Sequence, residues 1–195
     1  MRFGVTGIFA SGKGTVCAMF EELGAEVIDT DLLAREIMDP GSQVISQIET
    51  IFGQEFIDKD GSLKRRELAN YVFKDEVLVE KLNSITHPAI LALVKKRSSG
   101  SGIYMVNTPL LFESGFDKFM DYNIVVTAFS DQVIERGIKR DNISSEEIKE
   151  RLNHQIPLNE KIKLADYIID NSGSLEQTKR QVIDIWKIFN QNQQG

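Results

Sequence analysis

The sequence predicts an α/β protein whose β-sheet is mostly parallel. Short apolar runs, typical of strands covered on both faces, alternate with longer stretches in which apolar residues recur at helical spacing. A glycine-rich turn also follows the first apolar run and precedes a helical stretch. The chain has 195 residues, of which 42% are hydrophobic, and this is enough material to bury a sizeable core. We therefore expect a single domain over residues 1–195.

The expected elements alternate along the chain. The expected strands are residues 2–6, 25–29, 103–107, 122–128 and 167–170. The first helix ends at Gly24 and places four apolar side chains on one face: Val16, Met19, Phe20 and Leu23. The last helix begins near Ser174 and repeats this pattern with Val182, Ile185, Trp186 and Phe189. Both faces are predicted to lie in the core.

Two charged helical stretches interrupt this alternation. Residues 32–97 hold several predicted helices and are interpreted as an inserted helical region. Turn signals divide this region at Asp39-Pro40-Gly41, Asp60-Gly61 and His87-Pro88. Residues 141–165 form a smaller excursion, interpreted as a mobile lid, whose helix begins with hydroxyl and acidic residues. The core then comprises about residues 1–31, 98–140 and 166–195.

Charge and cysteine content exclude several classes of protein. With 23 Lys and Arg against 29 Asp and Glu, the formal net charge is −6, which disfavours nucleic acid or an anionic membrane as the main partner. The single cysteine, Cys17, cannot form an intramolecular disulfide. No apolar run approaches the roughly 20 residues of a membrane span, and the first residues do not resemble a signal peptide. We expect a cytoplasmic protein with no obligate protein partner.

The strongest motif is a phosphate-binding loop. Residues 7–13 satisfy the pattern G-x-x-x-x-G-K between an expected strand and an expected helix. Such a loop binds a nucleoside triphosphate, because its backbone N–H groups surround the phosphates while a lysine, here Lys13, reaches the β- and γ-phosphates. We expect the Lys13 side chain to be exposed at the loop. Gly14 stands where a serine or threonine hydroxyl normally binds Mg²⁺, and Thr15 comes one residue later.

The loop alone fits a kinase, a GTPase switch or a motor ATPase. The guanine-recognition pattern N/T-K-x-D is absent, which argues against a GTPase switch. Asp29 ends the second expected strand and Asp31 comes two residues later, where one of them is placed to act as a general base. Asp31 can equally be the N-cap of the following helix, and the sequence leaves both roles open.

The chain resembles the dephospho-CoA kinase family along nearly its whole length. Individual short matches are weak, but their order and spacing follow the family. The matching segments are residues 7–15, 27–31, 34–35, 40–42, 52–53, 60–63, 66, 68, 72–73, 87–88, 109–113, 139–141 and 165–174.

The resemblance implies a P-loop kinase fold. This fold has a five-stranded parallel sheet flanked by helices, an inserted helical region for the acceptor substrate, and a lid. It also implies that the chain transfers phosphate from ATP, with Mg²⁺ as cofactor, to the ribose 3′-hydroxyl of dephospho-CoA. The products are CoA and ADP, in the last step of CoA biosynthesis.

The resemblance also implies roles for individual residues. Asp31, Lys13 and Arg140 match catalytic positions: the proton acceptor, the phosphate lysine and a lid arginine. Residues matching the ATP site are Gly7, Ala10, Ser11, Gly12, Lys13, Gly14, Thr15, Arg140 and Asn171. The acceptor side matches Asp31 with Arg35, His87 and Glu113, although His87 can instead stabilise the bend at Pro88 and the other two can be members of structural ion pairs. Thr15 is the candidate metal contact, through water.

Some positions depart from the family pattern. Ile8 and Ala10 replace glycines of the loop, and Asn107 stands where many members have aspartate. Ile8 and Ala10 require the loop backbone to tolerate side chains, whereas Gly14 and Asn107 remove a hydroxyl and a carboxylate that could otherwise lie near Mg²⁺. A nucleoside monophosphate kinase of the adenylate kinase type is one alternative, because it shares the core and the loop, although residues 109–113 and 169–171 argue against it. The changed metal positions leave a non-catalytic nucleotide-dependent regulatory module as a second alternative.

Overall fold

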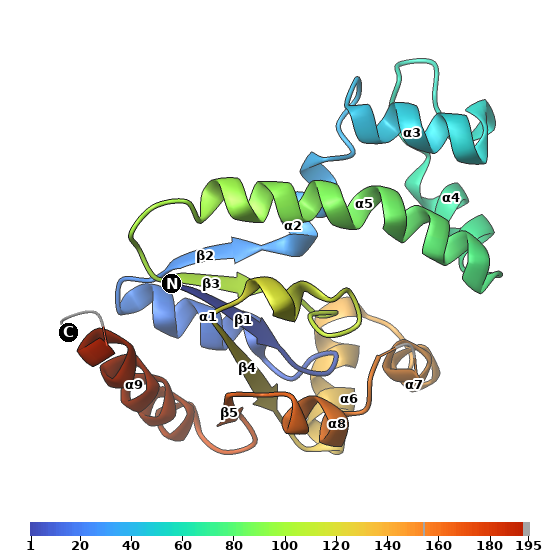
Figure 1. Cartoon of the computed structure of the whole chain (residues 1–195). Helices are drawn as coiled ribbons and strands as arrows, with labels where there is room; N and C mark the ends of the chain where they lie inside the picture. The colour runs from blue at the N-terminus through green and yellow to red at the C-terminus, as the bar shows by residue number, and fades with distance from the viewer. Residues whose placement is uncertain (154, 193–195) are drawn as a thin grey trace. The chain divides into compact units, whose positions relative to one another are not determined.

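A computed structural model describes residues 1–153 and 155–192. It contains a five-stranded sheet with the strand order β2-β3-β1-β4-β5 (Figure 1). The strands are β1 (Arg2–Thr6), β2 (Glu26–Asp29), β3 (Tyr104–Asn107), β4 (Tyr122–Thr127) and β5 (Tyr167–Asp170). All five predicted strands are confirmed, each within one residue of its expected bounds.

The strand order determines where the phosphate loop emerges. Strand β1 pairs in parallel with β3 on one side and with β4 on the other, and β4 pairs in parallel with β5. Parallel neighbours need crossover connections, and ligands of such sheets bind beyond the carboxyl ends of the strands. The segment after β1 therefore leaves the sheet at the middle of the edge where a ligand is expected.

The helices follow the predicted alternation. They are α1 (Lys13–Glu22), α2 (Thr30–Glu36), α3 (Gln43–Phe52), α4 (Arg65–Val72), α5 (Glu76–Arg97), α6 (Ser130–Asp141), α7 (Ser145–Asn153), α8 (Leu158–Lys163) and α9 (Leu175–Asn192). Two short 3₁₀ helices are η1 (Gln54–Phe56) and η2 (Phe116–Phe119). The chain divides into two compact units: one is Asp29–Ser99, and the other comprises Met1–Ile28 and the chain from Gly100 onward.

The core of the sheet unit confirms both predicted apolar stripes. Helices α1 and α9 pack against each other and against strand side chains. The rings of Phe3 and Phe189 stack with their centroids 3.8 Å apart, and both side chains are fully buried. Phe20 of α1 stacks on the same Phe189 ring. This burial of large rings between α1, α9 and β1 holds the helix that follows the phosphate loop in place.

The other unit is helical, as the sequence predicts for residues 32–97. Helix α5 contacts α2, α3 and α4, and buries Ile85, Ile90 and Val94. The expected helix boundary at His87-Pro88 is wrong, because α5 continues through Pro88. Proline inside a helix costs about 3 kcal/mol, and the packing of α5 on three other helices offsets this cost.

Helix α5 also corrects the expectation that no stretch is long and apolar enough to cross a membrane. Among the described residues it is the one helix that passes this test by length and composition, with a mean hydropathy of 1.3 over 18 residues. One such helix is weak evidence for a membrane span, since long helices of soluble proteins pass the same test.

Candidate active site

The glycine-rich loop, residues 7–15, connects β1 to α1 as its motif predicts. Gly12 is the N-cap of α1 and lies in the left-handed region, with φ +96°, and no side chain caps the helix. The first N–H groups of α1 are therefore not bonded by a capping side chain and can bind an anion, which the helix dipole also favours. Gly14 and Thr15 are exposed in the first turn of α1.

Two positions of this loop require glycine for space. A Cβ atom on Gly7 would lie 2.3 Å from the carbonyl oxygen of Val126, and one on Gly12 would lie 2.1 Å from Nδ2 of Asn171. Ala10 replaces a glycine of the related loops and still adopts a left-handed φ of +54°. This conformation costs an alanine about 1–2 kcal/mol, and burial of the methyl group in a small apolar cluster with Ala128 and Val133 partly compensates for it.

Lys13 is half-buried, so the expectation of a fully exposed side chain is wrong. Its Nζ donates to the carbonyl oxygens of Gly7 and Ile8, at 3.3 and 3.2 Å. The ammonium group therefore lies against the loop that precedes α1. A bound phosphate would compete with the two loop carbonyl oxygens for hydrogen bonds from this ammonium group.

Arg140 lies in the last turn of α6, beside the loop. Its Nε and Nη2 donate to the two carboxylate oxygens of Asp141, at 2.7 and 2.9 Å, and these hydrogen bonds lower the pKa of Asp141. The guanidinium carbon lies 5.0 Å from the ring centroid of Phe9, and that of Arg151 lies 5.2 Å from the same centroid. Both guanidinium groups therefore lie over the ring of Phe9, and their positive charge beside the loop favours an anionic ligand.

The segment between α7 and α8 is joined to the loop by a hydrogen bond. The N–H of Phe9 donates to Oε1 of Gln155 at 2.9 Å. Residue 155 belongs to the stretch expected to form the lid. The position of that stretch and the backbone of the loop are therefore linked directly.

Asn171 follows β5 and is buried beneath the loop. Its Nδ2 donates to the carbonyl oxygen of Ser11 at 2.8 Å, and its Oδ1 accepts from Oγ1 of Thr178 at 3.0 Å. Both polar atoms of the side chain are thus bonded to protein groups.

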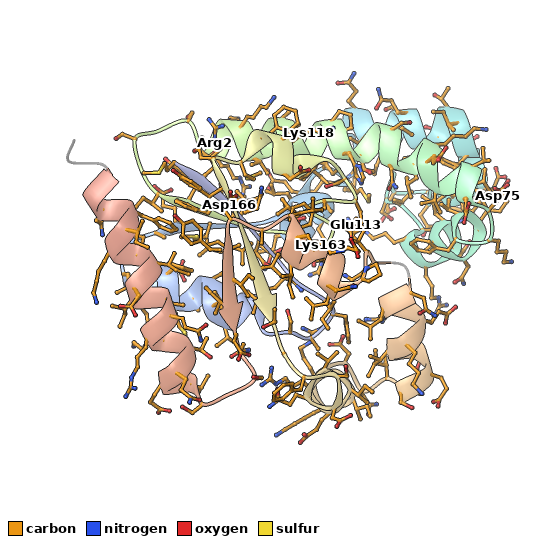
Figure 2. The ribbon with its side chains drawn as sticks, turned by 60° about the horizontal axis from the view of Figure 1, so that its bottom comes forward. Arg2, Asp75, Glu113, Lys118, Lys163 and Asp166 are labelled. Atoms are coloured by element: carbon orange, nitrogen blue, oxygen red, sulfur yellow. The ribbon has the colours of Figure 1, made fainter. Side chains whose placement is uncertain are left out.

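Glu113 forms an ion pair with a lysine that the sequence did not single out. Lys161 of α8 is completely buried, and its Nζ lies 2.8 Å from Oε1 of Glu113 and donates to the carbonyl oxygen of Pro109 at 3.0 Å. The same Oε1 accepts from the N–H of Ile156 at 2.9 Å. Figure 2 labels Glu113 beside the helix that carries this lysine. These contacts correspond to the ion-pair role that the sequence left open for Glu113.

The remaining candidates, Asp31, Arg35 and His87, lie in the helical unit. The N-cap of α2 is Asp29, whose carboxylate accepts from the N–H groups of Asp31 and Leu32 at 2.8 and 3.2 Å. Asp31 is therefore not the cap, and its exposed side chain stands in the first turn of α2. His87 is half-buried in α5, and burial lowers its pKa, which favours a neutral ring near pH 7.

The described residues contain no group of three or more side chains suited to hold a metal ion. Thr15 presents an exposed hydroxyl at the start of α1. One hydroxyl with water fits a magnesium ion that is bound mainly by phosphate oxygens, since Mg²⁺ commonly keeps several water ligands.

Comparison with known proteins places these features in one family. The dephospho-CoA kinase family model matches residues 1–177. A curated dephospho-CoA kinase from Listeria monocytogenes is 37% identical over 194 residues, which covers 97% of each chain. This chain belongs to the dephospho-CoA kinase family.

Solved structures agree with this membership. A crystal structure of TT1252 from Thermus thermophilus superposes with a TM-score of 0.85 at 30% identity, covering 96% of each chain. A dephospho-CoA kinase from Campylobacter jejuni gives a TM-score of 0.72 at 28% identity, covering 98% of each chain. The P-loop kinase fold predicted from the sequence is therefore confirmed.

Within the sheet unit, the structure of this dephospho-CoA kinase family member brings Lys13, Arg140 and Asn171 to the loop region, and pairs Glu113 with α8. Sequence reasoning missed several residues that contact the loop or support it: Phe9, Arg151, Gln155, Lys161 and Thr178. Phe9 offered one signal, as an aromatic residue inside a glycine-rich loop. The others offered no signal for these contacts: Arg151, Gln155 and Lys161 act through partners distant in sequence, and Thr178 contacts Asn171 across the turn before α9.

Replacing Lys161 with methionine is expected to lower the free energy of unfolding by about 3 kcal/mol, because it leaves the Glu113 carboxylate without its buried cation. Adding Glu113→Gln should restore much of this loss, since a neutral pair avoids the stranded charge. Urea denaturation of the four proteins forms a double-mutant cycle that measures the coupling. Lys163→Met, which breaks only an exposed pair with Glu160, is the control and should change stability by less than about 1 kcal/mol. Additive single effects would show that the two side chains are not coupled.

Proposed function

We propose that this chain transfers the γ-phosphoryl group of ATP to the ribose 3′-hydroxyl of dephospho-CoA. The products are CoA and ADP, and the reaction is the last step of CoA biosynthesis. The observation that carries the proposal is a phosphate loop, open at the start of α1, in a chain that belongs to the dephospho-CoA kinase family.

In the proposed reaction, the 3′-oxygen forms a bond to the γ-phosphorus as the bond from this phosphorus to the β–γ bridging oxygen breaks. ADP leaves with the electron pair, and Asp31 accepts the hydroxyl proton. Lys13 and Arg140 stabilise the charge of the transferring group, with the loop N–H groups holding the β- and γ-phosphates. Two features of the sheet unit support this assignment: the position of the Lys13 ammonium over the loop and the stacking of Arg140 on Phe9.

We further propose that residues 32–97 bind the acceptor, with Arg35 and His87 among the contacts, and that residues 141–165 act as a lid. The contacts of Arg151 and Gln155 with Phe9 support the second part, because they join that stretch to the loop. A lid that closes over the phosphates would exclude water, and the γ-phosphoryl group would then reach the ribose hydroxyl in preference to water.

The proposal includes Mg²⁺, which would neutralise charge on the β- and γ-phosphates. Thr15 would contact it through water. Gly14 is exposed, and a Cβ atom added there would meet nothing within 4 Å. A side chain at position 14 can therefore be added without a clash.

We expect Gly14→Ser to tighten the apparent affinity for Mg²⁺ roughly fivefold at fixed ATP concentration, since it restores the hydroxyl that such loops usually provide. Magnesium titrations of initial rates in the two proteins measure this effect. Gly14→Ala separates the added hydroxyl from the added methylene. An equal response of the alanine and serine variants would show that position 14 does not face the metal.

The test of the function is an assay of the purified protein with Mg²⁺, each nucleoside triphosphate and a panel of acceptors, with products detected by mass. Phosphorylated dephospho-CoA is the expected product. Phosphorylation of AMP but not of dephospho-CoA would overturn the proposal and favour a nucleoside monophosphate kinase, and absence of any turnover would favour a regulatory module.

A further inference from the structure

Asn171 has a backbone that is held in place independently of any ligand. Its N–H donates to the carbonyl oxygen of Thr127 at 2.9 Å, which continues the ladder between β4 and β5. Its own carbonyl oxygen accepts from Nη2 of Arg136 at 3.1 Å. The side chain therefore starts from a fixed point at the end of the sheet.

The side-chain amide of Asn171 has no freedom to turn toward a ligand. Asn171 is only 6% exposed, and Thr178 of α9, which donates to Oδ1 of Asn171, is fully buried. The hydrogen bond from Thr178 and the acceptor presented by Ser11 together determine which end of the amide carries the donors. A reversed amide would place two oxygens against each other at the loop.

The carbonyl oxygen of Ser11, which accepts the hydrogen bond from Asn171, belongs to the peptide between Ser11 and Gly12. Carbonyl and N–H point in opposite directions in a planar trans peptide, so a carbonyl held toward Asn171 directs the Gly12 N–H to the other face of the loop. The absence of a Cβ on Gly12 lets the amide approach this closely. If this peptide turned over, its carbonyl oxygen would take the place of a donor and repel a bound phosphate.

We infer that Asn171, locked by Thr178, is a positioning residue that keeps the Ser11–Gly12 peptide oriented for triphosphate binding and makes no contact with the nucleotide itself. This inference rests on the proposed function, because it takes the loop as an ATP site. It differs from the role that family resemblance implied, in which Asn171 contacts ATP.

The two roles differ in which part of ATP they affect. Loss of a positioning residue weakens binding of the triphosphate moiety, so that ATP and inorganic tripolyphosphate are affected by the same factor. Loss of a contact to the base or ribose weakens ATP alone. Calorimetric titration of both ligands, in the presence of Mg²⁺, separates the roles without any acceptor substrate. The result is thus independent of whether dephospho-CoA is the acceptor.

We expect Asn171→Ala to weaken both ligands by the same factor, between about 10-fold and 100-fold, since a buried loop carbonyl loses its donor. Asn171→Asp should weaken both further, because a carboxylate oxygen would face the carbonyl oxygen of Ser11. Thr178→Val should weaken both by roughly threefold through loss of the amide lock, and Thr178→Ser, which keeps the hydroxyl, should restore the affinities.

Thermal unfolding of each variant provides the control for folding, and the two Thr178 variants keep the test decisive if Asn171→Ala does not fold. A variant with weakened ATP binding and unchanged tripolyphosphate binding would overturn the inference in favour of a direct nucleoside contact. Unchanged affinity for both ligands in folded Asn171→Ala or Thr178→Val would also overturn it, since the pair would then be purely structural.

Discussion

Replacing Lys13 with alanine is expected to lower the rate of phosphoryl transfer on the order of 10³–10⁴-fold, because the charge of the transferring group loses its nearest preorganised cation. The side chain is half-buried, and its Nζ donates hydrogen bonds to the loop carbonyls of Gly7 and Ile8. The core formed by α1, α9 and the strands does not depend on them, so the fold should survive.

Single-turnover transfer, measured beside a thermal melting curve, tests this expectation. Lys179→Ala is the matched control, since it removes one lysine from the same unit and breaks only the exposed pair with Glu22. The control should retain the normal rate. A normal rate in the Lys13 variant would remove the loop lysine from the mechanism.

Replacing Asp31 with asparagine is expected to lower kcat on the order of 10²–10⁴-fold with ATP affinity nearly intact, because the amide keeps the shape of the side chain but cannot accept the proton. The lower end of this range is favoured if the transition state is loose, since the hydroxyl then needs little deprotonation early in the reaction.

The structure sharpens this test, because Asp29 and not Asp31 caps α2. The free energy of unfolding of Asp31→Asn should therefore stay within about 0.5 kcal/mol of the parent, as measured by urea denaturation. Glu36→Gln removes a charge from the same helix, where the side chain pairs with Arg97, and controls for net charge. An unchanged kcat in Asp31→Asn would exclude Asp31 as the proton acceptor.

The sequence predicted the strands, the phosphate loop and the apolar faces of α1 and α9. Each of these depends on local information: the period of the apolar residues, glycines where the chain turns sharply, and a lysine at a fixed distance from them. The ordered set of short matches to the dephospho-CoA kinase family then predicted the family. This prediction depended on the order and spacing of the matches along the whole chain, and not on any contact between residues.

Local patterns could not predict the partners of individual side chains. Pro88 marks a helix boundary by its own chemistry, yet α5 continues through it because three other helices pack on α5. The sequence left Asp31 open as a general base or as the helix cap. The structure gives the cap to Asp29, whose backbone is extended and whose carboxylate accepts from the first N–H groups of α2.

By itself, then, the sequence determined the elements, their order and the chemistry of the loop. Only the tertiary structure decided three sets of contacts: the ion pair of Glu113 with the buried Lys161, the two guanidinium groups over the ring of Phe9, and the hydrogen bond from Asn171 to the loop. The physical reason is that secondary structure follows from interactions between near neighbours in the chain. The partner of a buried polar group is instead set by which elements the packing of the core brings together.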